Sequence, residues 1–265
     1  MSKNKIVMCD TMIWYDVNDG ATVFDKSKYK YYGSVSNIAD FLSSDKMKLD
    51  ESVQKKLKQA IKKMNEEADD IIMVDPTSVG SSEWFKIPID EEEVRGMQRL
   101  YDELLRYANG EAITLVGPTI NGLIQSKEKF RDGIINAKKQ LVDLFSQKTY
   151  TKEQENKIII KNILVWLLIE WNKMRGTEFT RKQFNNWESI EVFVKSYAEF
   201  LKTVNIEQPP NKNTMIDLLQ LLYIRPKGST LIWTKETKLL QKIRSAFPEN
   251  DLKDIIYQDH LRHYS

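Results

Sequence analysis

The sequence predicts an α/β fold in which a central parallel sheet is interrupted by a mainly helical insertion. Three observations predict it: a short apolar run near the start of the chain, a run of β-favouring residues near its end, and a long middle stretch with helical periodicity. An α/β domain split by an insertion is the simplest architecture that uses both ends in one domain.

The first predicted strand covers residues 6–9, a continuous apolar run that ends at Asp10. Such a run is typical of a central strand buried on both faces, and its last residue emerges at the carboxyl edge, where ligands bind. Residues 31–36 are rich in Tyr, Val and Ser and predict a second short strand or extended entry. A helical turn is expected from near Asn37, with Asp40 on its first turn.

The middle of the chain carries helical patterns. From residue 50, apolar residues recur at near four-residue spacing and lysines occupy the other faces, which predicts a lysine-coated amphipathic helix. Residues 71–74 predict a strand stopped by Asp75-Pro76, and residues 79–82 predict a loop. Further helices are expected over residues 90–110, 123–147, 152–174 (with a capping box from Thr151 and Gln154) and 181–204.

After a proline-containing linker at residues 207–211, the elements change character. Residues 214–223 predict an apolar helix capped by Asn213, and residues 229–233 favour a strand. Two more helices are expected, over residues 235–247 and 251–263. The predicted domain organisation is a core from residues 1–43 and 205–265, with a helical insertion at 44–204 that partly continues the core.

Composition limits the classes of function. The 265 residues include 40 Lys and Arg against 38 Asp and Glu, a net charge of +2, so a basic groove can arise only by local sorting of charge. The single cysteine, Cys9, excludes an internal disulfide and a thiolate metal cluster, and it fits a reducing compartment. Because the N-terminus does not resemble a signal peptide, we expect a cytoplasmic location.

Residues 158–169 form the most apolar helical stretch, but polar residues interrupt it and it is too short to span a bilayer. We therefore expect a buried helix and no membrane partner. Trp166, Trp171 and Trp187 follow helical periodicity, which favours core packing over stacking on nucleic-acid bases. The sequence leaves a protein partner or a homo-oligomer open.

Four acidic side chains stand at comparable places in the predicted elements. Asp10 ends a strand, Asp40 starts a helix, Asp217 lies one turn into another helix, and Glu236 lies just past the last strand. If the strands are neighbours in a parallel sheet, each carboxylate lies within one side chain's reach of the same edge. Carboxylates without His or Cys are the ligands that hard cations prefer, so we expect Mg²⁺ or Mn²⁺ as the cofactor.

Four segments of the chain resemble the PIN-like nuclease family. Residues 6–14 resemble its opening strand, an apolar run ending in Asp followed by Thr or Ser and an apolar residue. Residues 36–42 resemble its second acidic motif, and residues 213–223 resemble the helix that bears the third. Residues 231–240 resemble the strand and turn that bear the fourth, where a Thr is followed two positions later by an acid.

The resemblance implies a three-layer PIN-like fold and a metal-dependent endoribonuclease. Asp10, Asp217 and Glu236 would hold one or two divalent ions, and Asp40 would complete the catalytic cluster or orient the attacking water. RNA is the expected substrate because members of the family mostly cut RNA, although the residues themselves do not distinguish it from single-stranded DNA.

Supporting residues follow from the same resemblance and from charge. Thr11 and Thr234 would hold the carboxylates in place through hydrogen bonds. Lys55, Lys58 and Lys62 on the lysine-coated helix are candidate contacts to the phosphate backbone of a nucleic acid, with a solvated helix face as the alternative interpretation.

The chain departs from the family pattern in three ways, and two of them, the exchanges at Asp40 and Glu236, favour an alternative. The second acid is typically Glu and is Asp40 here, while the fourth is typically Asp and is Glu236 here. These exchanges keep the charge but can move a metal by about an ångström, which is enough to weaken catalysis. The gap between Asp40 and Asp217 is also long. The alternative is a catalytically inactive PIN-like scaffold that binds nucleic acid or regulates.

Each acid also has a purely structural interpretation. Asp10 can end a strand and cap a turn, Asp40 can complement the dipole of a first helical turn, and Glu236 can be an exposed residue at a helix start. Asp217 is harder to explain this way, because it lies in an apolar helix where a buried, unpaired charge is costly. A helical adaptor with incidental acids would require that the two terminal segments do not share a sheet.

Overall fold

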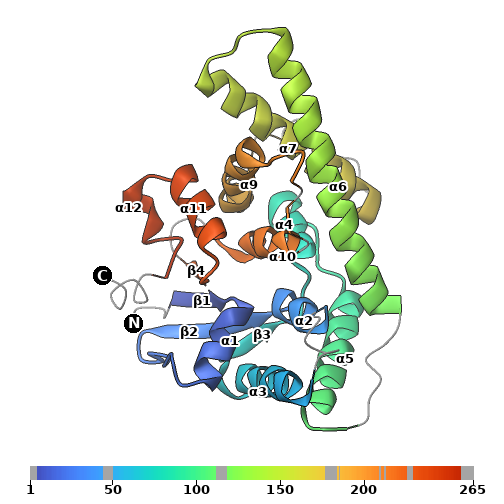
Figure 1. Cartoon of the computed structure of the whole chain (residues 1–265), viewed down its shortest axis with the longest axis vertical. Helices are drawn as coiled ribbons and strands as arrows, with labels where there is room; N and C mark the ends of the chain where they lie inside the picture. Colours follow the sequence, from blue (N-terminus) through green and yellow to red (C-terminus); the bar gives the residue numbers. More distant parts are fainter. Residues whose placement is uncertain are drawn as a thin grey trace.

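The computed structural model of the chain has an α/β fold built on a parallel sheet (Figure 1). It describes residues 5–43, 50–111, 118–176, 184, 186–208, 210–211, 213–225 and 229–257, with the backbone alone at residues 118–127 and 174–175. The α/β class and the all-parallel sheet of the prediction are confirmed.

Four strands among the described residues form the sheet in the order β3-β2-β1-β4. Their bounds are β1 (Lys5–Cys9), β2 (Tyr29–Ser34), β3 (Asp70–Ile72) and β4 (Thr230–Trp233). The first strand pairs in parallel with β2 on one side and with β4 on the other. The two ends of the chain therefore share one sheet, so the helical adaptor with unrelated terminal segments is wrong.

Helices cover both faces of this sheet (Figure 1). Their bounds in the first half of the chain are α1 (Thr11–Asn18), α2 (Val35–Leu42), α3 (Glu51–Glu67), α4 (Pro76–Phe85), α5 (Glu91–Ala108) and α6 (Pro118–Gln147). In the second half they are α7 (Lys152–Arg175), η2 (Glu188–Ile190), α9 (Glu191–Thr203), α10 (Thr214–Leu219), η3 (Gln220–Tyr223), α11 (Thr237–Ala246) and α12 (Glu249–Leu252).

Side chains of β1 alternate between two hydrophobic cores, which gives the fold three layers. Val7 and Cys9 pack with residues of α1, α3 and α5 on one face, and Met8 packs with residues of α4, α9 and α11 on the other. None of the three is more than 3% exposed. A strand buried on both faces needs apolar residues throughout, which explains the continuous apolar run in the sequence.

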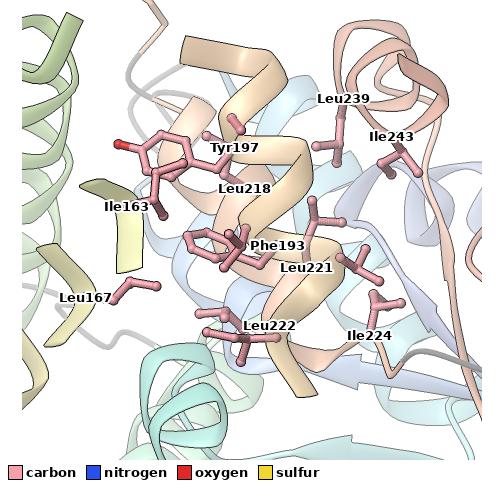
Figure 2. Close-up of a cluster of buried hydrophobic side chains, with 14 of the residues drawn as sticks. Ile163, Leu167, Phe193, Tyr197, Leu218, Leu221, Leu222, Ile224, Leu239 and Ile243 are labelled. Carbon is pink, nitrogen blue, oxygen red and sulfur yellow. The ribbon is translucent and has the colours of Figure 1, made fainter. Parts of the chain in front are cut away.

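The larger core surrounds α9 (Figure 2). Phe193 and Tyr197 of α9 lie among apolar side chains of α7, α10, η3 and α11, including Ile163, Leu218 and Leu239. Fully burying one such side chain contributes about 1.5–3 kcal/mol. Hydrophobic packing on α9 therefore holds the outer helices against the sheet.

Two long helices, α6 and α7, reach away from the sheet (Figure 1). Both pack against α9. Thr151 and Gln154 form the capping box predicted at the start of α7. Trp171 is buried in the core, and Trp166 and Trp187 pack against it, so the predicted core packing is confirmed; Trp187 precedes η2 and does not lie in a helix. No helix among the described residues is long and apolar enough to cross a membrane.

Two predicted boundaries in the first third of the chain are wrong. Residues 79–82 were expected as a loop and lie in α4, because Asp75 accepts a hydrogen bond as its N-cap and Pro76 opens its first turn. The helix predicted from near Asn37 begins earlier, at Val35, because Ser34 is its N-cap. Asp40 consequently lies beyond the first turn of α2.

Later boundaries differ as well. The helix predicted over 181–204 is shorter: α9 begins only after η2, and residues 181–183 of that prediction lie outside the described residues. The helix predicted over 251–263 ends early, because α12 stops at Leu252 and Ile256 forms a single parallel bridge to Ile232 of β4, while residues 258–263 lie outside the described residues. That bridge extends the sheet by one residue beyond β4.

Gly80 allows α4 to lie close to η3 and α7. A Cβ at this position would be 2.9 Å from Cδ2 of Leu222 and 3.0 Å from Cη2 of Trp171. Alanine gains about 1 kcal/mol in helix propensity, but overpacking a core costs about 1–3 kcal/mol. We therefore expect Gly80→Ala to lower the free energy of unfolding by up to about 2 kcal/mol in urea denaturation.

Gly96 in α5 is the matched control for this prediction. The nearest atom to a Cβ there is Nη2 of Arg99, the far end of a flexible side chain, at 3.9 Å. We expect Gly96→Ala to raise the free energy of unfolding by about 0.5–1 kcal/mol. Stabilisation by both substitutions would show that the contact at Gly80 is not tight.

Candidate functional site

The candidate site lies at the carboxyl edge of the sheet, where β1 and β4 end side by side. Asp10 follows β1 directly, and its backbone N–H donates to the carbonyl oxygen of Trp233 at 2.9 Å. From β1 the chain builds β2 and β3 on one side and returns to place β4 on the other. Ligands of open α/β sheets bind outside the carboxyl ends of the strands at such a reversal of strand order.

Hydrogen bonds hold both carboxylate oxygens of Asp10. The hydroxyl of Thr234 donates to Oδ2 at 2.6 Å, and the backbone N–H of Thr11 donates to Oδ1 at 2.6 Å. The second bond makes Asp10 the N-cap of α1. Thr234 thus contacts the carboxylate through its side chain and Thr11 through its backbone, so the orientation of Asp10 is fixed from two segments of the chain.

The pKa of Asp10 is raised to about 6, chiefly because the side chain is buried. The hydrogen bond from Thr234 lowers it, while the nearby charges of Asp40 and Glu236 raise it. Burial and like charge both disfavour the ionised form. A dication beside Asp10 would offset both effects, which fits the hard-cation chemistry expected from oxygen ligands.

Asp40 projects from α2 and is half-buried. Its charge acts on two groups: it raises the pKa of Asp10, and it adds to the effect of burial in raising the pKa of the Tyr15 hydroxyl. Because α2 starts at Val35, the interpretation of Asp40 as a first-turn residue is wrong. Its charge lies beside the end of β1 instead.

Glu236 follows β4 and has a structural role as the N-cap of α11. Its backbone N–H donates to the hydroxyl of Thr234 at 3.0 Å, and its Oε1 accepts from the N–H of Lys238 at 3.3 Å as the N-cap of α11. Its carboxylate still acts on Asp10, since its charge raises the pKa of that residue.

Asp217 lies in the first turn of α10 and is half-buried. Its helix packs against α2, which carries Asp40. The charges of Asp40 and Glu236 act on Asp10, so these three acids are electrostatically coupled, and Asp217 lies on the helix that adjoins α2. Within the described residues, which include all four acids, no three acidic, His or Cys side chains are close enough to hold one metal ion together.

Asn37 is a residue of the site that the sequence did not indicate. It is 1% exposed, and its Nδ2 donates to the carbonyl oxygen of Cys9 at 3.0 Å and to the hydroxyl of Thr11 at 3.3 Å. Its Oδ1 accepts from the N–H of Ser34 at 2.9 Å, so it also closes the capping box of α2. The spacing of Ser34 and Asn37 is the only sequence signal for it.

A second polar group, also missed from the sequence, lies past the end of β3. Burial raises the pKa of Asp75, and the nearby charge of Glu93 adds to it. The hydroxyl of Tyr223 donates to the carbonyl oxygen of Val74 at 2.7 Å and hydrogen-bonds with Ser36. An acid directly after a strand was a signal at Asp10, and the same signal was present at Asp75.

The predicted lysine contacts lie on α3. Lys55 is exposed, whereas Lys58 and Lys62 are half-buried. The ammonium of Lys58 lies 4.6 Å from the centre of the Tyr107 ring, a cation–π contact that ties it to α5. Lys55 is therefore the lysine of the three that most resembles a free surface contact for a phosphate backbone.

Comparison of the chain with models of protein families, with curated proteins and with solved structures found no match. Folds host many unrelated activities, so a function must be argued from its site. Here that means the geometry and charges around Asp10.

Proposed function

We propose that this chain is a divalent-metal-dependent nuclease of the PIN-like type, which hydrolyses phosphodiester bonds in single-stranded RNA. The observation that carries the proposal is the position of Asp10 at the reversal of strand order, between β1 and β4. Asp40 and Glu236 come from distant parts of the chain and add their charges at the same place. Buried carboxylates repel each other, so their convergence on one edge favours a cation-binding role over chance.

A Mg²⁺ or Mn²⁺ ion that keeps several of its waters suits these side chains, because the described carboxylates do not gather three around one ion and the waters would fill the remaining positions. Asp10 and Glu236 would hold it, with Asp217 from α10 as a further ligand, and all three offer only oxygen atoms. When bound, such an ion lowers the pKa of a water molecule, polarises the scissile phosphate and stabilises the leaving oxygen.

The residues of the chain supply orientation and proton transfer. Thr234 and the N–H of Thr11 fix the two oxygens of Asp10, which keeps one arrangement of the carboxylate at the edge. Asp40 is half-buried beside Asp10 and would orient the attacking water and accept its proton at a carboxylate oxygen. Lys55 on the exposed surface of α3 would contact the phosphate backbone.

A binding or regulatory scaffold without catalysis is the second candidate. It is favoured by the hydrogen bond between Oε1 of Glu236 and the N–H of Lys238, which uses this carboxylate to cap α11. A carboxylate committed to a helix cap is less free to follow a metal during a reaction. The two candidates share the fold and differ only in whether the edge beside Asp10 cleaves nucleic acid.

Cleavage assays with purified protein separate them. End-labelled single-stranded RNA and DNA of the same sequence are incubated with Mn²⁺, Mg²⁺ or EDTA, alongside Asp10→Asn, Asp217→Asn and the control Asp254→Asn. Asp254 is an exposed acid paired with Lys5, at the first residue of β1 and so away from the carboxyl edge. The nuclease predicts products with a 5′-phosphate and a 3′-hydroxyl, in RNA before DNA.

We expect cleavage in Mn²⁺, none in EDTA, and a loss of about 100-fold or more in the two site variants with full activity in Asp254→Asn. Equal cleavage by wild type and both site variants would mean a contaminating nuclease and would overturn the proposal. Retained RNA binding without cleavage would support the scaffold.

A further inference from the structure

An ion pair joins the two segments of the site. Nζ of Lys235 lies 2.5 Å from Oδ2 of Asp16, and the two side chains are only 26% and 18% exposed. The within-helix pair of Lys195 and Glu191 is more exposed, at 34% and 28%. Exposed pairs contribute little, whereas removing one partner of a buried pair leaves an uncompensated charge in a poorly solvated place.

The two partners stand at positions that matter for the site. Asp16 lies on α1, the helix that Asp10 caps at its first turn. Lys235 lies between Thr234, which donates to Asp10, and Glu236, which caps α11. The ion pair therefore fastens the turn after β4 to the helix after β1, across the place where the two strands end.

The side chain of Thr234 ties the turn after β4 to Asp10, while β4 and the buried face of α11 hold the two ends of the turn. Thr234 donates to Asp10 at 2.6 Å and accepts from the N–H of Glu236 at 3.0 Å. Neither hydrogen bond of Thr234 reaches the body of α1, so these bonds do not set the separation between α1 and the turn. A second attachment, through the neighbouring side chain of Lys235, fixes the direction of the turn and hence of Glu236.

We propose that the ion pair of Asp16 and Lys235 is a positioning clamp, which sets the distance of Glu236 from Asp10 across the site. Its effect on metal binding and cleavage rests on the proposed nuclease function; its effect on the turn does not. Because Asp16 holds the ammonium of Lys235, this lysine acts through the placement of Glu236 and is a positioning residue.

A clamp and a simple electrostatic effect predict opposite results. Through space, loss of the positive charge of Lys235 would strengthen cation binding at the acidic edge, and loss of the negative charge of Asp16 would weaken it. If the ion pair acts as a clamp, removal of either charge breaks it and has the same effect on the site. Lys235→Met and Asp16→Asn should therefore change the site in the same direction, and the double variant should be no worse than either single one.

The first readout is amide hydrogen exchange, which needs no activity. We expect Asp16→Asn and Lys235→Met each to raise the exchange rates of the Glu236 and Lys238 amides by about tenfold, and Lys235→Arg to leave them near the wild-type rates. The control is Glu83→Gln, which breaks the part-buried pair with Arg225 at 3.4 Å, on the segment that precedes β4. Unchanged exchange in both clamp variants would overturn the proposal.

The second readout is Mn²⁺ affinity by calorimetry and cleavage of labelled RNA at saturating Mn²⁺. We expect both clamp variants to bind Mn²⁺ about tenfold more weakly and to lose about tenfold in kcat, with recovery in Lys235→Arg. Tighter Mn²⁺ binding by Lys235→Met would overturn the clamp in favour of a through-space charge effect. If wild type neither binds Mn²⁺ nor cleaves RNA, the nuclease proposal fails, and the exchange rates still decide the clamp.

Discussion

Asp10→Asn is expected to raise the free energy of unfolding at pH 7 by about 1–3 kcal/mol while abolishing Mn²⁺-dependent cleavage. The pKa of Asp10 rises from 3.8 to about 6 on folding, so the ionised side chain opposes folding at neutral pH. Asparagine carries no charge and can still accept from the N–H of Thr11. Its side-chain amide can also donate to the hydroxyl oxygen of Thr234.

The raised pKa of Asp10 determines how the difference in stability between wild type and Asp10→Asn changes with pH. An acid with a raised folded pKa is protonated in both states below about 3.8, where it has no effect on stability. As the pH rises from about 4 to about 6, the unfolded chain loses this proton before the folded chain does, so wild type loses stability relative to the variant. Above about 6 the difference stays constant.

Urea denaturation between pH 3.5 and pH 7.5 measures this difference. Asp254→Asn is again the control, because that acid is exposed and lies on the opposite edge of the sheet. Saturating Mn²⁺ should reduce the difference at pH 7, since it stabilises wild type and not Asp10→Asn. A variant that is less stable than wild type at pH 7 would show that Asp10 contributes to the fold through its charge.

Asn37→Leu is expected to lower the free energy of unfolding by about 3 kcal/mol or more. Leucine is close in size but leaves the carbonyl oxygen of Cys9, the N–H of Ser34 and the hydroxyl of Thr11 without the bonds that Asn37 makes. Each buried polar group left unsatisfied costs about 1–3 kcal/mol. The loss also frees Thr11, so cleavage should fall with stability.

Asn65→Leu is the matched control for Asn37→Leu. Asn65 is an exposed residue of α3 whose Oδ1 accepts from the hydroxyl of Tyr101 at 3.1 Å. Its replacement should cost about 1 kcal/mol, because it removes one hydrogen bond where Asn37→Leu removes three. Thermal unfolding and urea denaturation compare the two, and similar small losses at both positions would mean that the network around Asn37 contributes little.

The sequence predicted those parts of the fold whose cause is local. The apolar run of β1 is long enough and buried enough to identify a central strand, and the β-favouring residues of β4 did the same at the other end. The capping box of Thr151 and Gln154 marked the start of α7 because the two side chains satisfy each other within one turn.

Local rules failed where two of them competed. Asp75-Pro76 signals both the end of a strand and the start of a helix, and the second role decides the structure of α4. At α2, the serine before Val35 caps the helix two residues ahead of the predicted start, because Asn37 completes the cap as its partner. In both places the sequence contained the N-cap residue of a helix, but the prediction assigned that residue to the preceding strand or to its end.

The sequence predicted that Asp10 and Glu236 lie near each other, but it did not predict the hydrogen bonds and the ion pair around them. Asp10 and Glu236 follow strands that proved to be neighbours, so their convergence followed from the sheet. The pair of Asp16 and Lys235, like the bonds of Asn37, depends on side-chain directions that periodicity does not determine. The metal roles of Asp10, Asp217 and Glu236 all stay predictions, and the position of Asp217 depends on packing of its helix against α2 rather than on a strand.

The pairing of β1 with β4 has a consequence for synthesis of the protein. Asp10 and Thr234 are 224 positions apart in sequence, so β1 pairs with β4 only after the segment that carries β4 has left the ribosome. Contacts between residues so far apart in sequence form slowly, and the edge of β1 stays unpaired and exposed until β4 has been synthesised. A nascent chain that stops before β4 has neither the β1–β4 strand pair nor the complete acidic edge, so β4 must be synthesised before the site around Asp10 can form.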